Sequence, residues 1–240
     1  MKAMLFAAGL GTRLKPFTDH HPKALAEVSG KTLLEHNIRY LRRFGITDVV
    51  VNVHHFADQI MAVLEKEAGF GSRVQVSHER EAVLETGGGL LNAWPLLKND
   101  EPVVVMNVDI LTNLNLTSLI ALHRQRGADA TLAVMQRASS RYLLFDETLR
   151  LCGWRNEKTG EEKRPVRSEV LQPRAFSGIQ ILSPRFIEAI PQRGKFSMID
   201  AYLALAGSHS IYGYDHTGDL FLDVGKPEAV QAAGGLFSGK

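Results

Sequence analysis

The sequence has little cysteine and no long hydrophobic run. Cys152 is its single cysteine, so no internal disulfide forms and the fold does not depend on an oxidising compartment. No apolar stretch approaches the roughly 18 residues of a membrane-spanning helix. Residues 1–9 are too soon interrupted by glycine to form a secretory signal. We therefore expect a cytoplasmic protein that does not enter a membrane.

An excess of one charge is also missing. The 28 basic residues nearly balance the 26 acidic residues, which leaves a net charge of +2. This balance gives no electrostatic basis for binding nucleic acid or a membrane surface. With 45% hydrophobic and 22% charged residues, the composition is that of a folded globular protein.

Strand and helix patterns alternate along the first part of the chain. Apolar runs predict strands at 1–6, 48–53, 73–78, 102–108 and 130–135. Helical spacing predicts helices at 32–44, 56–68, 87–97 (with Thr86 as N-cap) and 116–126. Residues 141–182 are predicted to be mostly strands and a charged loop, followed by helices near 184–190, 198–206 and from 227.

This order predicts an α/β fold, a Rossmann-like mixed and mostly parallel sheet with helices on both faces. No linker divides the chain, so we expect one domain over residues 1–240. Residues from about 136 onward would then fold onto the same sheet as about 1–135. Ligands of such sheets bind at the carboxyl ends of the strands, near the switch in strand order.

A glycine-rich loop follows the first predicted strand. Residues 9–14 (GLGTRL) lack the last glycine of a dinucleotide-binding loop, because Leu14 stands there. The P-loop-like residues 234–240 lack the Ser/Thr and a following helix. Glycines let backbone N–H groups approach phosphate, and Arg13 and Lys23 would add positive charge. The alternative is a surface turn with two solvated cations.

Residues 5–18 (LFAAGLGTRLKPFT) and 22–25 (PKAL) resemble the motif of the sugar-1-phosphate nucleotidyltransferases, LAAGxGTRLxPxT followed by PKxLxPV. Phe6 and Ala26–Val28 depart from that motif, but neither departure removes a phosphate-binding group. The resemblance extends over nearly the whole chain. It implies the nucleotide-diphospho-sugar transferase fold, with nucleotide bound by residues 1–135 and sugar phosphate by residues 136–240.

The resemblance also implies roles for individual residues. Arg13 and Lys23 would be the catalytic cations. The expected nucleotide-binding residues are Ala7, Ala8, Gly9, Gly11, Thr12, Arg13, Lys23, Glu85, Thr86 and Gly87. Asn107, Ser177 and Gly178 would contact the sugar phosphate, although residues 175–179 also fit a core strand with a glycine bulge.

Two aspartates complete the implied site. Asp109 ends a predicted buried strand, and Asp223 follows a short apolar run. Aspartates at such positions often serve as turn or cap residues. In the resembled family their counterparts together hold the metal, and Mg²⁺ suits carboxylate and phosphate oxygens. Val108 replaces the usual glycine between Asn107 and Asp109, so we expect a tighter space beside the metal.

The implied reaction joins a nucleoside triphosphate and a sugar 1-phosphate into an NDP-sugar and pyrophosphate. Residues 84–89 (LETGGG) look most like the N-acetylmuramic acid-1-phosphate uridylyltransferase branch, a cell-wall activity, and favour UTP. Residues 139–142 lack the acidic sugar contact expected there, so the acceptor could differ. The alternatives are guanylyl or cytidylyl transfer to mannose or heptose 1-phosphate or phosphocholine, and a non-catalytic nucleotide-sugar binding module.

Overall fold

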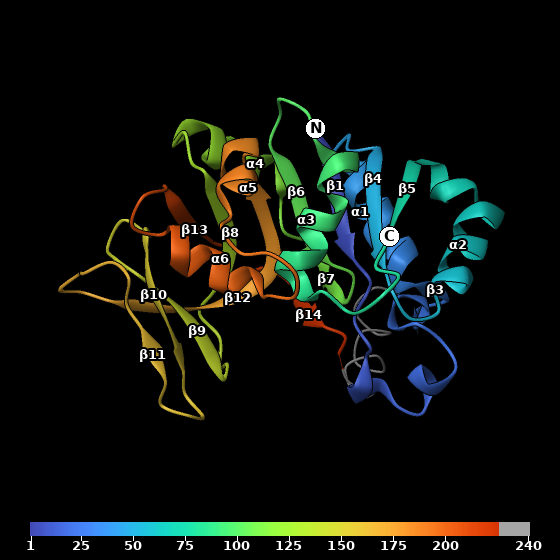
Figure 1. Cartoon of the computed structure of the whole chain (residues 1–240), viewed down its shortest axis with the longest axis horizontal. Helices are drawn as coiled ribbons and strands as arrows, with labels where there is room; N and C mark the ends of the chain where they lie inside the picture. The colour runs from blue at the N-terminus through green and yellow to red at the C-terminus, as the bar shows by residue number, and fades with distance from the viewer. Residues whose placement is uncertain (226–240) are drawn as a thin grey trace.

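A computed structural model describes residues 1–225 of the chain (Figure 1). The predicted helix from residue 227 and the P-loop-like residues 234–240 lie outside this range. Within it, no helix is long and apolar enough to cross a lipid bilayer.

The helices and strands alternate much as the periodicity predicts. The helices are α1 (Leu33–Arg43), α2 (Ala57–Lys66), α3 (Glu85–Leu97), α4 (Leu116–Gln125), α5 (Pro184–Ala189) and α6 (Met198–Leu205). The strands are β1 (Lys2–Phe6), β2 (Glu27–Val28), β3 (Lys31–Thr32), β4 (Asp48–Val53), β5 (Arg73–His78), β6 (Val103–Asn107), β7 (Ile110–Thr112), β8 (Ala130–Met135), β9 (Arg141–Phe145), β10 (Leu151–Asn156), β11 (Glu162–Lys163), β12 (Gln172–Leu182), β13 (Ile211–Asp215) and β14 (Phe221–Asp223).

Local signals explain several of these boundaries. Thr32 accepts a hydrogen bond from the Glu35 amide and caps α1, and Gly45 follows the helix in a left-handed conformation. Ser197 and Asp200 form a reciprocal capping box at the start of α6. The 3-10 turns η1 (Thr12–Leu14), η2 (Phe17–Asp19), η3 (Lys23–Leu25) and η4 (Ala68–Gly71) were not predicted.

Ten strands form one mixed sheet. Strands β5, β4, β1 and β6 run parallel in that order, and β12 joins β6 antiparallel. Strand β12 also pairs with β8 and with β9. Strand β13 pairs with β8, and β10 and then β11 continue the sheet beyond β9. The later part of the chain therefore continues the sheet of the earlier part through β12.

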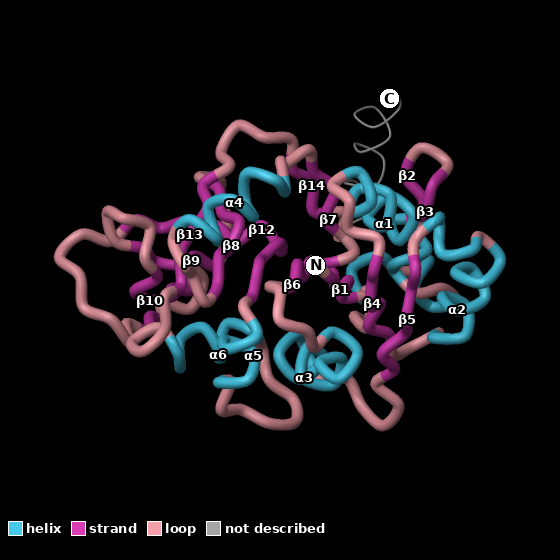
Figure 2. The backbone as a smooth tube through the Cα atoms, turned by 90° about the horizontal axis from the view of Figure 1, so that it is seen from above, coloured by secondary structure: helices cyan, strands magenta, loops and turns pink. Residues whose placement is uncertain are grey.

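Helices cover both faces of this sheet, as predicted. Helices α1, α2 and α4 lie on one face, and α3, α5 and α6 lie on the other (Figure 2). Side chains of β1 alternate between the two layers, because Leu5 packs with Leu34 of α1 while Met4 packs with Leu90 of α3. The two apolar layers fix the sheet and so position its strand ends.

Candidate active site

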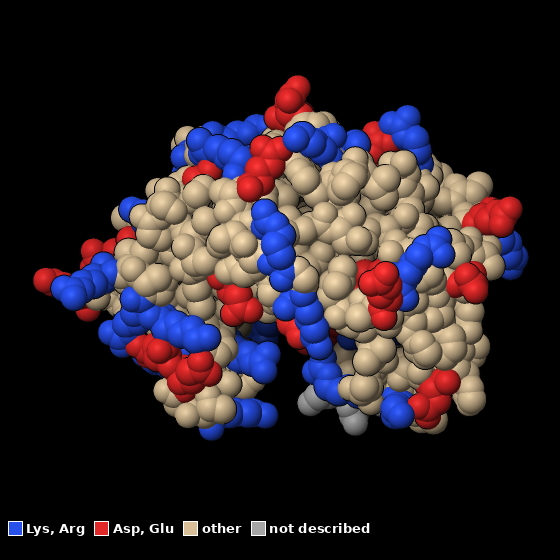
Figure 3. Space-filling view, in the orientation of Figure 1, with Lys and Arg blue, Asp and Glu red and all other residues tan. Residues whose placement is uncertain are grey.

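The carboxyl ends of β4, β1 and β6 open into a cleft of about 330 Å³. Strand order reverses at β1, because the chain goes to β4 and β5 on one side before it reaches β6 on the other. At this end of the sheet the space-filling view shows a hollow with Lys and Arg side chains at its rim (Figure 3). The residues lining the cleft are Phe6, Ala7, Ala8, Gly9, Gly11, Thr12, Arg13, Lys23, Asn52, Glu79, Val83, Glu85, Thr86, Asn107, Val108, Asp109 and Gly225.

The glycine-rich loop forms one wall of this cleft. Gly11 adopts a left-handed conformation (φ +61°), and its carbonyl oxygen accepts hydrogen bonds from the Leu14 amide and the Thr18 hydroxyl. This tight turn presents Thr12 and Arg13 to solvent at the edge of the cleft. Among the predicted nucleotide-binding residues, only Gly87 is absent from the lining.

Lys23 forms an ion pair with Asp109 on the floor of the cleft. The exposed fraction is only 11% for the Lys23 side chain and 18% for that of Asp109. The turn η3 supplies the lysine and the end of β6 supplies the aspartate. A phosphate entering the cleft would therefore meet a cation that is already oriented by a carboxylate.

The hairpin of β7 and β14 brings the second predicted carboxylate beside the first. Asp223 is paired in register with Ile110, the residue after Asp109. The Val224 amide donates a 2.8 Å hydrogen bond to the Asp109 carbonyl oxygen. Asp109 lines the cleft, whereas Asp223 does not and lies beside it, next to the lining residue Gly225.

Arg13 and Asp223 converge on Gly225. A Cβ atom on Gly225 would lie 2.7 Å from Asp223 Oδ1 and 2.8 Å from Arg13 Nη2. A side chain would displace both groups, so their present positions against residue 225 depend on glycine here. The predicted Asp-Val-Gly run therefore has a packing role, and the chemical role of Asp223 stays a prediction.

The oxygen ligands at this edge fit a magnesium ion. Mg²⁺ is usually held by one or two carboxylates together with waters and substrate phosphates. Asp109 and Asp223 supply two carboxylates, and within residues 1–225 no group of three or more His, Cys, Asp or Glu gathers. Zinc sites need three or four protein ligands, usually His and Cys. The donor set therefore suits a hard cation that also binds phosphate.

Asn52 and Glu79 are lining residues that sequence reasoning missed. Both are almost fully buried, and Asn52 Nδ2 donates to Glu79 Oε1 at 2.9 Å. The other carboxylate oxygen accepts from the Leu84 amide at 2.8 Å. Each residue sits at or just after a strand end, β4 or β5, and this placement is the only signal that could have found them.

The start of α3 differs from the prediction. The helix begins at Glu85, with no side-chain cap at Leu84, and the Thr86 hydroxyl accepts instead from the Met198 amide at 3.0 Å. Thr86 as N-cap was therefore wrong. The Gly87 amide donates to the Phe196 carbonyl oxygen, and a Cβ there would lie 2.2 Å from the Phe196 ring. Gly87 thus allows α3 to pack closely against the segment before α6.

Of the residues predicted to contact the sugar phosphate, Gly178 lies against Asn107. Its φ is +71°, and a Cβ would lie 2.8 Å from Asn107 Nδ2. Ser177 is fully buried, and its hydroxyl hydrogen-bonds His216 Nε2 at 2.8 Å. Its side chain therefore points away from the cleft, and a sugar contact through Ser177 stays a prediction.

Val108 lines the cleft but is almost fully buried. The residue is 3% exposed and belongs to the core layer with α1. Its carbonyl oxygen accepts from Asn37 Nδ2 at 2.8 Å, and its amide donates to the Phe6 carbonyl oxygen at 3.2 Å. The valine side chain therefore helps to anchor the end of β6 to α1, and its expected effect on the metal space stays a prediction.

The family model described as nucleotidyl transferase matches residues 2–143 of the chain. This range holds the glycine-rich loop, Lys23 and Asp109. The chain belongs to the nucleotidyl transferase family. The resemblance noted in the sequence is thereby confirmed, as are the fold and the enzyme class.

Relatives of this nucleotidyltransferase act on different sugars. The chain is 34% identical to N-acetylmuramate alpha-1-phosphate uridylyltransferase of Caulobacter vibrioides, over 96% of its length and 94% of that protein. It is 29% identical to mannose-1-phosphate guanyltransferase beta-A of Xenopus laevis, over 95% of its length. The chain spans only 62% of that guanyltransferase.

Solved structures of similar proteins share this architecture throughout. HddC from Yersinia pseudotuberculosis, solved in complex with GMP-PN, superposes with a TM-score of 0.78 at 25% identity, covering 98% of this chain and 99% of that one. The inositol-1-phosphate CTP transferase of T. maritima, at 16% identity, shares the fold with a TM-score of 0.72. It covers 95% of this chain and 90% of its own.

Proposed function

We propose that this nucleotidyltransferase joins a nucleoside triphosphate, preferably UTP, to a sugar 1-phosphate and releases pyrophosphate. One observation carries the proposal. A cleft at the switch point of the sheet brings the glycine-rich loop, Arg13, Lys23 and Asp109 together, and Asp223 lies at its edge. The uridylyltransferase relative, which matches nearly end to end, supports UTP.

In this reaction an oxygen of the sugar phosphate attacks the α-phosphorus, and the bond between the α-phosphorus and the bridging oxygen breaks. The bond electrons leave with pyrophosphate. A phosphate monoester has a second pKa of about 6, so the attacking oxygen is already ionised at neutral pH. No general base is needed, and the protein's task is positioning and charge neutralisation.

Individual residues divide that task. Lys23 neutralises charge at the α-phosphate, and Arg13 with the amides of the glycine-rich loop holds the departing pyrophosphate. Asp109 and Asp223 would hold Mg²⁺, which when bound supplies further charge neutralisation and aligns phosphate oxygens. Asn107 contacts the sugar phosphate on the side where Gly178 lies.

Guanylyl transfer is the second candidate, and Glu79 favours it. An ionised carboxylate only accepts hydrogen bonds. Guanine presents two adjacent donors on one edge, whereas uracil presents one. Glu79 lines the cleft near the start of α3, where we place the nucleobase. Its two oxygens each already accept one hydrogen bond, from Asn52 and from the Leu84 amide, and each has a second lone pair for a base donor. The guanyltransferase relative from Xenopus laevis and HddC, which was solved with GMP-PN bound, support the same alternative.

A substrate panel tests both candidates. The purified protein with Mg²⁺ is given UTP, GTP, CTP, dTTP or ATP, each with glucose, mannose, heptose or N-acetylmuramic acid 1-phosphate or with phosphocholine. Pyrophosphate release is measured. Fastest turnover with UTP supports the main proposal, and fastest turnover with GTP supports the alternative. No pyrophosphate release with any pair would contradict both and favour a binding module.

A further inference from the structure

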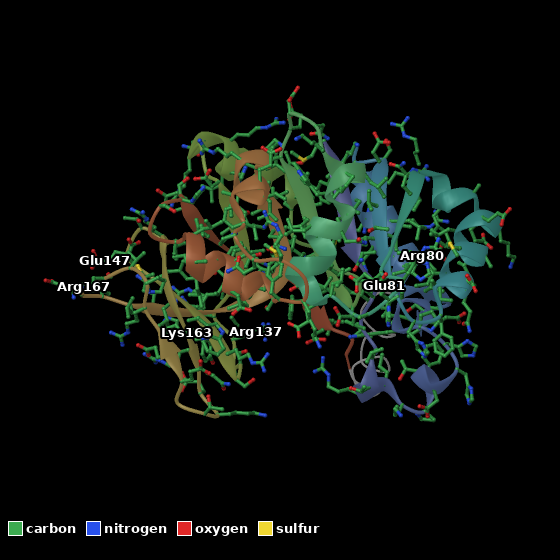
Figure 4. The ribbon with its side chains drawn as sticks, viewed as in Figure 1. Arg80, Glu81, Arg137, Glu147, Lys163 and Arg167 are labelled. Carbon is green, nitrogen blue, oxygen red and sulfur yellow. The ribbon has the colours of Figure 1, made fainter. Side chains whose placement is uncertain are left out.

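Arg137 occupies an unusual place beside the site just described. It follows β8, and its guanidinium lies 4.6 Å from the centre of the Phe221 ring on β14. Nη2 donates a 2.9 Å hydrogen bond to the carbonyl oxygen of Phe176 on β12. Figure 4 shows Arg137 toward the middle of the molecule, whereas Arg167 lies at the far end of the part formed by β9, β10 and β11. The residue thus links β8, β12 and β14 next to Asp223.

The charge of Arg137 has no full partner within residues 1–225. Nη2 is the only one of its nitrogens that hydrogen-bonds another described residue, and Nε is buried without a partner. No carboxylate of the described chain lies within ion-pair distance. Burial lowers the pKa of Arg137, and attraction to Asp223 opposes that effect. A half-buried cation with unused donors is costly unless a ligand supplies acceptors.

Space for such a ligand lies next to Arg137. A broad hollow of about 790 Å³ is lined by Arg137, Tyr142, Arg174 and Glu157 among others. Arg174 Nε forms an ion pair with Asp215 at 3.0 Å, and Glu157 forms one with Arg155 at 3.6 Å. Arg137 is therefore the cation lining this hollow whose charge is not already matched.

The neighbours of Arg137 place it on the acceptor side. Phe176, which accepts its hydrogen bond, lies two residues before Gly178 on β12. Gly178 contacts Asn107, and Asn107 lines the cleft. Asp223 acts electrostatically on Arg137 from the opposite strand. An anion bound by Arg137 would thus lie near Asp223 and near the end of the cleft that Asn107 lines.

We propose that Arg137 binds the phosphate of the acceptor sugar 1-phosphate and so orients its attacking oxygen. This inference rests on the proposed function. The planar guanidinium fork matches two phosphate oxygens, and the contact with the Phe221 ring restricts where the guanidinium lies. A second acid group on the sugar would offer the same chemistry, so the test distinguishes the two sources.

The first test measures the kinetics of Arg137→Gln. Arg167→Gln is the control, because it also removes one positive charge but at the far end of this part of the molecule. The two acceptors are glucose 1-phosphate and N-acetylmuramic acid 1-phosphate, which adds a carboxylate. We expect the KM for each acceptor to rise on the order of ten- to a hundredfold in Arg137→Gln, by the same factor for both. The KM for the nucleotide should stay within about twofold, and Arg167→Gln should match wild type.

The outcomes separate the possibilities. An effect confined to the acid sugar would overturn binding of the 1-phosphate and assign Arg137 to the second acid group. Unchanged acceptor KM values, or an equal rise in the nucleotide KM, would also overturn the proposal. If the wild-type protein releases no pyrophosphate with any acceptor, that result would instead contradict the proposed function itself.

A binding measurement that needs no turnover completes the test. The Nε–H group of Arg137 is shielded from water, so its ¹⁵N–¹H signal should be resolved, and its loss in Arg137→Lys assigns it. Adding inorganic phosphate to wild-type protein should shift this signal, and adding glucose should not. An unmoved signal at saturating phosphate would overturn the proposal even if activity is never detected.

Discussion

At the scale of single residues, Lys23 and Asp109 form an ion pair that competes with the roles we propose for them. Without substrate, each charge neutralises the other in a mostly buried place. In the proposed reaction the ammonium would instead contact phosphate, and the carboxylate would bind a cation. The ion pair therefore lowers the free-energy cost of keeping both groups in the cleft, because neither is left as an isolated buried charge.

Exchanging each aspartate for asparagine separates catalysis from stability. Asp109→Asn should lower kcat about 100-fold or more, and it should cost about 1–3 kcal/mol in unfolding free energy because Lys23 loses its partner. Asp223→Asn should lower kcat similarly but change stability by less than about 0.5 kcal/mol, since Asp223 is exposed and has no ion pair within residues 1–225. Pyrophosphate release and urea unfolding measure the two effects. Near-normal turnover in either variant would refute the metal role.

At the scale of elements, β12 carries the most varied contacts. Its first residues pair with β9, its middle and end pair with β8, and its end also pairs with β6. The pairing with β8 is interrupted between Phe176 and Gln180. This bulge is where Gly178 meets Asn107, so an irregularity of the strand shapes the wall of the cleft that Asn107 lines.

Gly178→Ala tests that contact, and Gly160→Ala is its control. Both glycines have φ +71°, but only at Gly178 would a Cβ meet a neighbour, Asn107 Nδ2 at 2.8 Å. Each variant should lose about 1–2 kcal/mol for the left-handed backbone. Gly178→Ala should lose more and should raise the KM for the sugar phosphate as Asn107 shifts. Equal stability losses and equal KM values in the two variants would argue against the contact.

Two tyrosines on helices of opposite faces provide a second prediction. The Tyr40 hydroxyl on α1 donates to the Leu114 carbonyl oxygen at 2.6 Å, whereas the fully buried Tyr202 hydroxyl on α6 has no partner within residues 1–225. Burial raises the pKa of both side chains. Tyr40→Phe should cost about 0.5–1.5 kcal/mol, and Tyr202→Phe should be neutral or stabilising. Chemical unfolding compares them, and a larger loss for Tyr202→Phe would contradict this account.

At the scale of the whole molecule, buried histidines link stability to pH. His123 lies between α4 and the sheet, where its Nδ1 is 2.9 Å from Thr131 Oγ1. Desolvation lowers the pKa of His123 from 6.5 to about 4, against a smaller opposing attraction from Asp129. Burial also lowers the pKa of His216. Both imidazoles are therefore neutral in the folded protein near neutral pH.

The sign of the pH effect follows from these shifts. Between pH 6.5 and about 4 the unfolded chain binds a proton at His123 that the folded chain does not, so stability should fall as pH falls through this window. The loss from His123 should be on the order of 3 kcal/mol at most. Urea unfolding at pH 7.5 and pH 4.5 measures it. His123→Gln should reduce the difference between the two pH values, and exposed His55→Gln should not.

Much of the molecule follows from the sequence because hydrophobic periodicity is local. Residues 73–78 and 130–135 are predicted strands that match β5 and β8 at both ends. The glycine-rich loop and Lys23 were identifiable because their spacing is fixed within a short motif. Strands β2, β3 and β7 have two or three residues each and carry no periodicity, so they were missed.

The rest of the site depends on how distant elements meet. Asn52 and Glu79 become a hydrogen-bonded pair only when β4 and β5 are neighbours. Arg137 gains its stacking partner only when β14 lies beside the end of β8. Such contacts are set by tertiary packing, and no window of the sequence contains both partners. The division into a nucleotide part and a sugar part stays a prediction.

The central position of β1 has a consequence for synthesis on the ribosome. Lys2 lies opposite Asp48, and Ala3 lies opposite Val104, so the strand that emerges first must wait for both of its neighbours to be translated. Until then its apolar residues and unpaired amides are exposed to other nascent chains and to chaperones. We therefore expect the yield of native protein to depend on translation speed between β1 and β6.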